Sequence, residues 1–158
     1  MVTLLLWAAL SIGFSFLCSI LEAVLLSVTP SFVTQQLQSG STTGKLLNEY
    51  KEDIDKPLAA ILTLNTIAHT VGAMGVGAVA GKLYGGQYLS ENIPISWETI
   101  IAVVMTLLIL FASEIIPKTI GANNWRSLSG FTTRTLKFLM FILAPLVWVS
   151  TLITKSFK

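Results

Sequence analysis

The chain has 158 residues, of which 53% are hydrophobic and 11% are charged, and its mean hydropathy is +0.76. A soluble domain carries roughly 25% charged residues, so this composition indicates a protein that is surrounded by lipid. The formal net charge of +2 is small, and no basic stripe interleaved with aromatic residues is present, which argues against nucleic-acid binding. The single cysteine, Cys18, excludes an internal disulfide and a thiolate metal cluster, and we expect it to be an inert core residue.

Three apolar segments are long enough to span a membrane, at residues 1–28, 57–81 and 97–117. Each approaches or exceeds the ~20 residues that a helix needs to cross a hydrocarbon core. We interpret the first segment as a retained helix, because no positive region precedes it and it is too long for a cleaved signal peptide. Between the first two spans, residues 29–56 predict an amphipathic helix that ends at Gly40 and then a polar helix. The sequence therefore predicts an all-α integral membrane protein.

The lysines and arginines predict the orientation of the spans, because cytoplasmic loops are enriched in both. A fourth apolar run, 138–153, is short, contains Pro145, and as a span would place the final Lys155 and Lys158 outside. Three spans keep the basic clusters on one side, so we expect a cell-membrane protein with its N-terminus outside and its C-terminus in the cytoplasm. The basic residues of the cytoplasmic side are then Lys45, Lys51, Lys56, Lys118, Arg126, Arg134 and Lys137, whereas the outer loop 82–96 contains only Lys82.

Residues 124–158 are expected to form juxtamembrane helices along the cytoplasmic surface of the membrane. In the stretch NWRSLSGFTTRTLKFLMF, basic residues are interspersed with aromatic residues and leucines, a pattern typical of an interfacial helix. Pro145 is expected to kink this region.

Polar residues form a stripe on the first span. Ser15, Ser19 and Glu22 are spaced by four and then three residues, so they share one helical face, and Ser11 extends it. The serines could instead bond back to their own helix, and Glu22 could reach the interface. A carboxylate at the bilayer centre costs ~2.5–3.5 kcal/mol or more, and we interpret the stripe as functional.

The second span carries Asn65 and His69 one turn apart. Asparagine in a membrane helix often only joins helices, for ~0.6–2 kcal/mol, and a single histidine is often a hydrogen-bonded interior residue. Further along, Gly77 and Gly81 form a GxxxG pair, and Gly72 precedes them. Because small residues let another backbone approach closely, these three glycines are candidates for a dimer interface.

The third span ends with Ser113, Glu114 and Pro117. Proline has no N–H, so the carbonyl four residues earlier, that of Ser113, lacks its helical donor. This carbonyl, the Ser113 hydroxyl and the Glu114 carboxylate predict an oxygen-rich notch. Alternatively, Glu114 pairs with Lys118 at i+4 and Pro117 simply ends the helix. We expect Lys118 to reach the cytoplasmic interface rather than to pair with Glu114.

The oxygen-bearing residues of the three spans lie at similar predicted depth. Hard cations such as Mg²⁺ prefer oxygen ligands, about six in octahedral array, although Ca²⁺ and Mn²⁺ accept the same oxygens. Soft ligands are scarce in this sequence, so zinc and copper are poorly supported. The predicted metal-binding residues are Ser19, Glu22, Asn65, Ser113 and Glu114, with Ser15, His69 and Pro117 as further candidates.

Three motifs together resemble the transmembrane domain of the CNNM/CorC family. They are FLCSILEAVLLSVTPS at 16–31, LTLNTIAHTVGA at 62–73 and SEIIPKTIGANNW at 113–125. The match covers nearly the whole of residues 1–158. The resemblance implies three membrane helices and a juxtamembrane belt, assembled as a homodimer.

The resemblance also implies a function, since the family is associated with Mg²⁺ transport. An acidic cavity open to the cytoplasm would bind dehydrated Mg²⁺, and Mg²⁺ export would be coupled to Na⁺ entry. The coordinating residues would be Ser19, Asn65, Ser113 and Glu114, with Glu22 lining the cavity. Family members usually continue into cytosolic CBS-pair domains, and we expect residues 1–158 to be the membrane domain without them.

Two other hypotheses belong to different functional classes. A membrane sensor or scaffold that binds Mg²⁺ without moving it would need the same ligands, so the sequence leaves it open. An intramembrane enzyme is poorly supported, because neither a nucleophile-elbow motif nor an HExxH motif is present. We therefore expect a protein that is not an enzyme.

Overall fold

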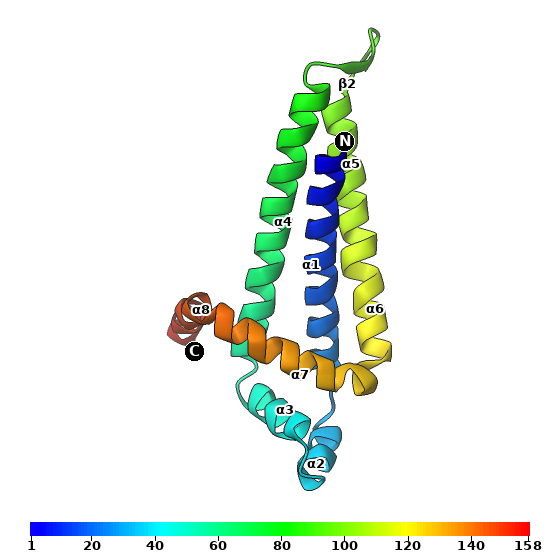
Figure 1. Cartoon of the computed structure of the whole chain (residues 1–158). Helices are drawn as coiled ribbons and strands as arrows, with labels where there is room; N and C mark the ends of the chain where they lie inside the picture. The colour runs from blue at the N-terminus through cyan, green and yellow to red at the C-terminus, as the bar shows by residue number, and fades with distance from the viewer.

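Three long apolar helices lie side by side in the computed structural model, which describes residues 1–158 (Figure 1). They are α1 (Val2–Ser27), α4 (Asp55–Tyr84) and the continuous span Trp97–Asn123. All three are long and apolar enough to cross a membrane. α1 packs against α4 on one side and against the third span on the other. The three predicted spans are thus confirmed, with α4 longer at both ends than predicted.

The third span consists of three helical pieces, α5 (Trp97–Leu108), the π-helix η1 (Ile109–Ile115) and α6 (Ile116–Asn123). The expectation that this helix ends near residue 117 was wrong. Pro117 lies in the first turn of α6, where the fixed φ of proline suits a helix, although its missing N–H leaves the Ser113 carbonyl, four residues earlier, without that donor. The helix therefore continues past Pro117, and the irregularity falls in the π-helical turn before it.

Two short helices, α2 (Pro30–Gln38) and α3 (Thr42–Glu52), connect α1 with α4. Gly40 lies between them with φ +74°, a left-handed conformation that favours glycine. The Ser41 hydroxyl then accepts a hydrogen bond from the Gly44 N–H and caps α3. The predicted pair of helices separated at Gly40 is confirmed.

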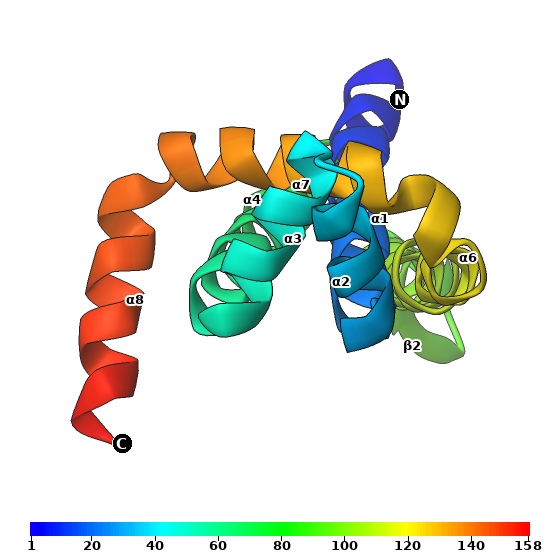
Figure 2. The same cartoon turned by 90° about the horizontal axis from the view of Figure 1, so that it is seen from below.

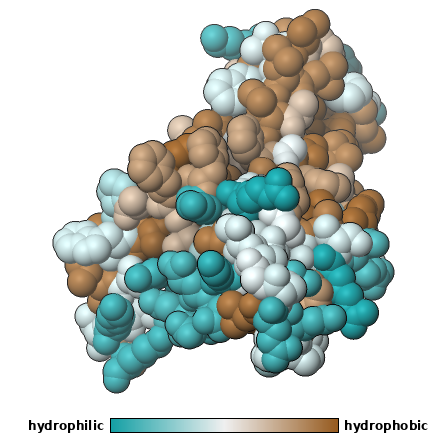
Figure 3. Space-filling view, turned by 60° about the horizontal axis from the view of Figure 1, so that its bottom comes forward, coloured by the Kyte–Doolittle hydropathy of each residue, from teal (hydrophilic) through white to brown (hydrophobic).

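The last two helices, α7 (Trp125–Ile142) and α8 (Ala144–Ser156), meet at an angle of 90°. The break lies at Leu143, and Pro145 lies in the first turn of α8. Seen from below, α7 crosses the bundle and α8 turns away from it at the side, so neither helix runs along the bundle (Figure 2). The bend thus divides the apolar run that would otherwise form a fourth span. Hydrophilic residues gather at this end of the molecule, whereas the bundle above it is mainly hydrophobic (Figure 3).

A two-stranded antiparallel hairpin, β1 (Tyr88–Ser90) and β2 (Ile93–Ser96), closes the opposite end of the bundle. These strands were not predicted from the sequence, and the observed class is all-α apart from this one exposed hairpin. After the hairpin, the Ser96 hydroxyl accepts a hydrogen bond from the Thr99 N–H and caps α5.

The best-packed region lies where α1, α3, α4 and α7 meet. Its buried hydrophobic residues are Cys18, Leu21, Leu25, Tyr50, Ile61, Leu136 and Leu139. The Tyr50 hydroxyl donates a hydrogen bond to the Thr133 carbonyl across 3.2 Å and so joins α3 to α7. Burial of Cys18 agrees with its predicted role as a core residue.

Packing between α1 and the third span differs along their length. At the α6 end, a Cβ added at Gly121 would lie 2.9 Å from the Ala23 Cβ and 3.0 Å from the Ile20 carbonyl oxygen, so glycine permits this close approach. At the other end, an apolar groove lies between α1 and α5, and its lining includes Leu4, Leu5, Trp97, Ile101 and Val104. The two helices are therefore held tightly only at the α6 end.

Candidate cation site

The serines of the predicted stripe are buried and face the other two spans. Ser11 donates a hydrogen bond to the Ala68 carbonyl of α4 at 2.9 Å. Ser19 donates to the Ser113 carbonyl of η1 at 2.5 Å. The alternative in which these hydroxyls bond back to their own helix was therefore wrong, since both bonds cross to a neighbouring span.

Ser15 lies at the centre of the polar cluster. Its Oγ is 2.8 Å from Asn65 Oδ1, 2.6 Å from His69 Nε2 and 3.5 Å from Glu114 Oε1. A hydroxyl has one proton, so Ser15 can donate only one of these bonds at a time. When it donates to Asn65, the contact with His69 requires the imidazole to donate Nε2–H to the serine oxygen. Groups from both other spans therefore contact this one side chain of α1.

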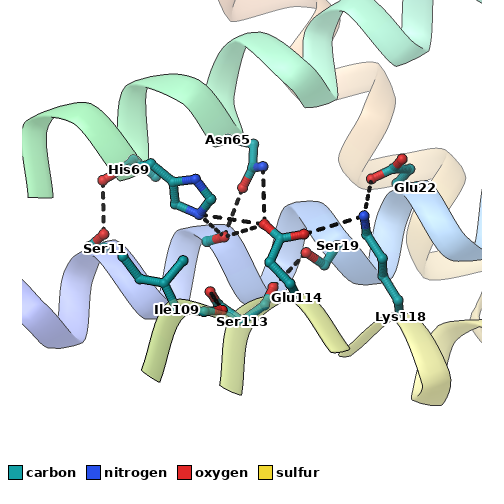
Figure 4. A network of polar contacts seen from close by, with 11 residues as sticks. Ser11, Ser19, Glu22, Asn65, His69, Ile109, Ser113, Glu114 and Lys118 are labelled. Carbon is teal, nitrogen blue, oxygen red and sulfur yellow. Dashed lines mark hydrogen bonds and ion pairs between the residues drawn. The ribbon is translucent and has the colours of Figure 1, made fainter. Parts of the chain in front are cut away.

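The Glu114 carboxylate presents its two oxygens to different surroundings (Figure 4). Oε1 accepts a hydrogen bond from Asn65 Nδ2 at 3.4 Å and lies 3.5 Å from His69 Nε2. Oε2 lies 3.3 Å from Lys118 Nζ. The side chain is 23% exposed, so the carboxylate is largely withdrawn from solvent and depends on these partners.

Lys118 does not point away from the site, and the expectation that it would leave Glu114 for the interface was wrong. Its Nζ is 3.3 Å from Glu114 Oε2 and also 3.3 Å from Glu22 Oε2 on α1. The i+4 spacing brings lysine and Glu114 together, and the close packing of α6 on α1 brings Glu22 within reach of the same ammonium. Glu22 therefore does not simply extend to the membrane interface, as the alternative interpretation held, but pairs with Lys118.

Of the two Ser113 oxygens predicted to line the notch near Pro117, only the backbone carbonyl faces the polar cluster. The Ser113 hydroxyl donates to the Ile109 carbonyl at 2.6 Å and so points back along its own helix. The Ser113 carbonyl, in contrast, faces α1 and accepts the Ser19 hydroxyl. Pro117 contributes no side-chain atom, and its part is the missing N–H.

The cluster offers mainly neutral oxygen atoms. No group of three or more histidine, cysteine, aspartate or glutamate side chains converges in a way that could hold a metal ion. The oxygens that converge come from serine hydroxyls, an asparagine amide, a backbone carbonyl and one carboxylate. Such a set suits a hard cation. The structure thus brings together Ser15, Ser19, Asn65, His69, Ser113 and Glu114, with Glu22 joined to them through Lys118.

From the sequence, Ser15 was only a further candidate and Lys118 was predicted at the interface, whereas the structure places both side chains in the cluster. The signal for Ser15 was present in its position midway along the Ser11–Ser19 stripe, four residues from each end. No sequence signal ties Lys118 to Glu22, since these residues are far apart in the chain and meet only through helix packing.

The glycines proposed for a dimer interface have different surroundings. A Cβ at Gly72 would lie 2.2 Å from the Ser11 Cβ, so this buried glycine packs α4 against α1 within the chain and is not available to a second copy. Gly77 is exposed, and a Cβ there would meet nothing within 4 Å. Near Gly81, the first atom that such a Cβ would meet is Glu98 Oε1, at 3.9 Å. The prediction that Gly72 lies at a dimer interface was therefore wrong. For Gly77 and Gly81 it stays a prediction.

Three apolar spans with a polar cluster between them define a multi-pass membrane protein with an internal polar site. The chain belongs to the CNNM family, since the Cyclin M transmembrane N-terminal domain matches residues 5–158. The predicted resemblance is confirmed.

Two curated relatives are similar to most of this chain. A UPF0053 protein of Synechocystis is 33% identical over 143 residues, which cover 90% of this chain and 39% of that protein. A UPF0053 protein of Haemophilus influenzae is 29% identical over 136 residues, covering 85% of this chain and 30% of that protein. The chain therefore spans well under half of the length of each of these relatives.

Proposed function

We propose that this chain is the membrane domain of a Mg²⁺ transporter and has no catalytic activity. The observation that carries the proposal is the meeting of polar groups from all three spans at Glu114, inside a bundle that exposes many large hydrophobic side chains. An ionisable group in such a place marks an ion pathway more often than a structural brace. Membership of the CNNM family, which is associated with Mg²⁺ transport, supports the same conclusion.

Magnesium would exchange its water for oxygens of the protein at this cluster. Ser15, Ser19 and Asn65 supply neutral oxygens, the Ser113 carbonyl supplies another, and Glu114 supplies charge. Each serine hydroxyl would turn its proton away from the ion, which releases the hydrogen bonds to Asn65 and to Ser113. The carboxylate offsets part of the large cost of dehydrating Mg²⁺. Any oxygens still missing from an octahedral set would come from water.

The transport cycle that we propose is export of Mg²⁺ from the cytoplasm, coupled to Na⁺ entry. The N-terminus would lie outside the cell, and the helices α7 and α8 would lie on the cytoplasmic surface. Gly77 and Gly81 on α4 would face the second subunit of a homodimer. Cytosolic CBS-pair domains would be attached after α8, in keeping with the greater length of the relatives.

Calorimetric titration of Mg²⁺ into the purified protein tests the site. We expect Glu114→Gln and Asn65→Ala each to weaken binding at least tenfold, since the first removes the negative charge and one oxygen atom and the second removes a ligand. Glu98→Gln is the matched control, because Glu98 is an exposed carboxylate at the other end of the same span. Equal affinity in Glu114→Gln and the wild type would rule out this site.

Flux measurements distinguish transport from sensing. We expect proteoliposomes to move Mg²⁺ and to do so faster when a Na⁺ gradient is imposed in the opposite direction. Binding of Mg²⁺ without flux, with or without Na⁺, would support the hypothesis of a sensor or scaffold.

A further inference from the structure

The cluster already contains a cation of its own. Lys118 lies on α6, and its ammonium bridges Glu22 of α1 and Glu114 of η1 at 3.3 Å from each carboxylate. The same Glu114 carboxylate faces Asn65 and Ser15 with its other oxygen. The lysine therefore contacts the same carboxylate that a cation bound at the proposed site would contact.

The charges around this bridge favour an exchange. Glu22 and Glu114 carry two negative charges and Lys118 carries one positive charge, so the unoccupied group has a net charge of −1. If a divalent ion bound while the lysine stayed, the net charge of the group would be +1, in a site largely shielded from water. If the ammonium leaves, the two carboxylates and the divalent ion sum to zero. Because uncompensated charge is costly in such surroundings, the neutral arrangement is favoured.

The side chain is suited to leaving. Lysine carries a compact charge on a flexible four-carbon stem, and the Lys118 side chain is 44% exposed, against 23% for Glu114 and 25% for Glu22. The ammonium can thus swing into water while its stem stays packed. The two carboxylates cannot do the same, because they are shorter and more buried.

We propose that Lys118 is a tethered counter-ion, which occupies the carboxylate pair when the site is empty and is displaced when a divalent cation binds. This inference rests on the proposed function of the site. A resident competitor lowers the affinity for the transported ion and returns to the carboxylates as the ion leaves. The lysine thereby helps release, a step that a transporter needs and a tight-binding site would slow.

The charge count also separates divalent from monovalent ions. One Na⁺ neutralises the group of −1 with Lys118 still in place, whereas Mg²⁺ neutralises it only when Lys118 has left. We therefore infer that Mg²⁺ moves this side chain and that Na⁺ does not.

Titration of Mg²⁺ into Lys118→Gln tests the proposal. We expect binding about tenfold tighter than in the wild type, because the ion no longer has to displace an ammonium that is paired with both carboxylates. Lys118→Arg is the matched control, because it keeps the charge and can pair with both carboxylates, and we expect its affinity to be at or below that of the wild type. A lysine that only braces α6 against α1 would give the opposite result, with Lys118→Gln binding more weakly.

A second measurement needs no variant. The wild-type protein is treated with an acetylating N-hydroxysuccinimide ester, and the rate at Lys118 is followed by mass spectrometry. We expect this rate to rise with Mg²⁺ and not with Na⁺, while the exposed Lys45 and Lys155 react equally in all conditions.

The outcomes distinguish the two proposals. Mg²⁺ binding that depends on Glu114, together with an unchanged Lys118 acetylation rate and no gain of affinity in Lys118→Gln, would overturn the exchange alone. No Mg²⁺ binding by the wild type would overturn both. If Lys118→Gln fails to fold, the acetylation rate in the wild type decides.

Discussion

The Ser19 hydroxyl donates a hydrogen bond to the Ser113 carbonyl at 2.5 Å, across the contact between α1 and η1. This carbonyl lies four residues before Pro117, which has no N–H to offer it. Ser19 of α1 thus bonds to a carbonyl that Pro117 of the third span leaves without a helical donor. The bond keeps this carbonyl close to the polar cluster.

Pro117→Ala is expected to weaken Mg²⁺ binding roughly fivefold, which corresponds to about 1 kcal/mol for one hydrogen bond. Alanine returns an N–H that can bond to the Ser113 carbonyl, so the carbonyl becomes less available to a cation. We expect no loss of thermal stability, because α6 gains a helix-forming residue. Calorimetry and thermal unfolding measure the two effects. Pro145→Ala, on α8, is the control, and a loss of affinity there as large as in Pro117→Ala would contradict this explanation.

Ser15→Ala is expected to lower the free energy of unfolding by ~1–3 kcal/mol, because it leaves Asn65 and His69 without a shared partner. Ser11→Ala is the control from the same stripe. Its hydroxyl bonds to a backbone carbonyl inside α4, which is part of a regular helix, so a smaller loss is expected. Thermal unfolding in one detergent compares the two, and equal losses would show that Ser15 has no special place in the cluster.

Gly121→Ala is expected to destabilise the protein by ~1–3 kcal/mol, because its Cβ would lie 2.9 Å from the Ala23 Cβ and force α6 away from α1. At Gly13 a Cβ would meet nothing within 4 Å. Gly13→Ala should therefore be neutral or slightly stabilising. If both variants unfold at the same temperature, the close approach of these helices does not contribute to stability.

Stability should fall as the pH rises above 10, partly because of Tyr50. Burial, with a smaller contribution from the neighbouring Glu49, raises the pKa of the Tyr50 phenol from 10.0 to about 12. The unfolded chain therefore loses this proton at a lower pH than the folded chain. The contribution to stability is complete below pH 10 and is lost between 10 and about 12.

Tyr50→Phe tests this effect, since the variant cannot ionise at this position. It also loses the hydrogen bond to the Thr133 carbonyl, so we expect about 1 kcal/mol less stability at pH 8. Its unfolding temperature should decline less steeply than that of the wild type above pH 10. Ultraviolet absorbance of tyrosinate follows the ionisation itself, and parallel declines in the two proteins would exclude Tyr50 as the cause.

The spans could be predicted because hydropathy and length report directly on the lipid environment. The polar face of α1 could be predicted because the spacing of Ser11, Ser15 and Ser19 fixes their common side, whatever the helix packs against. Burial of these serines and their bonds to α4 and η1 agree with that pattern.

The remaining features depend on packing. The ammonium of Lys118 reaches Glu22 only because Gly121 lets α6 approach α1, and neither fact is local in sequence. The third span continues beyond Pro117 after a π-helical turn, which no pattern in the sequence predicted. The hairpin after Gly86 was missed because its strands are short and exposed and lack the alternation that marks a buried strand.

The unequal packing of the third span against α1 has a mechanical consequence. The α6 end cannot separate from α1 without breaking the bond between Ser19 and Ser113, whereas the α5 end borders an apolar groove. Resistance to separating this span from α1 is therefore greatest near Gly121 and smallest at the end that carries the hairpin.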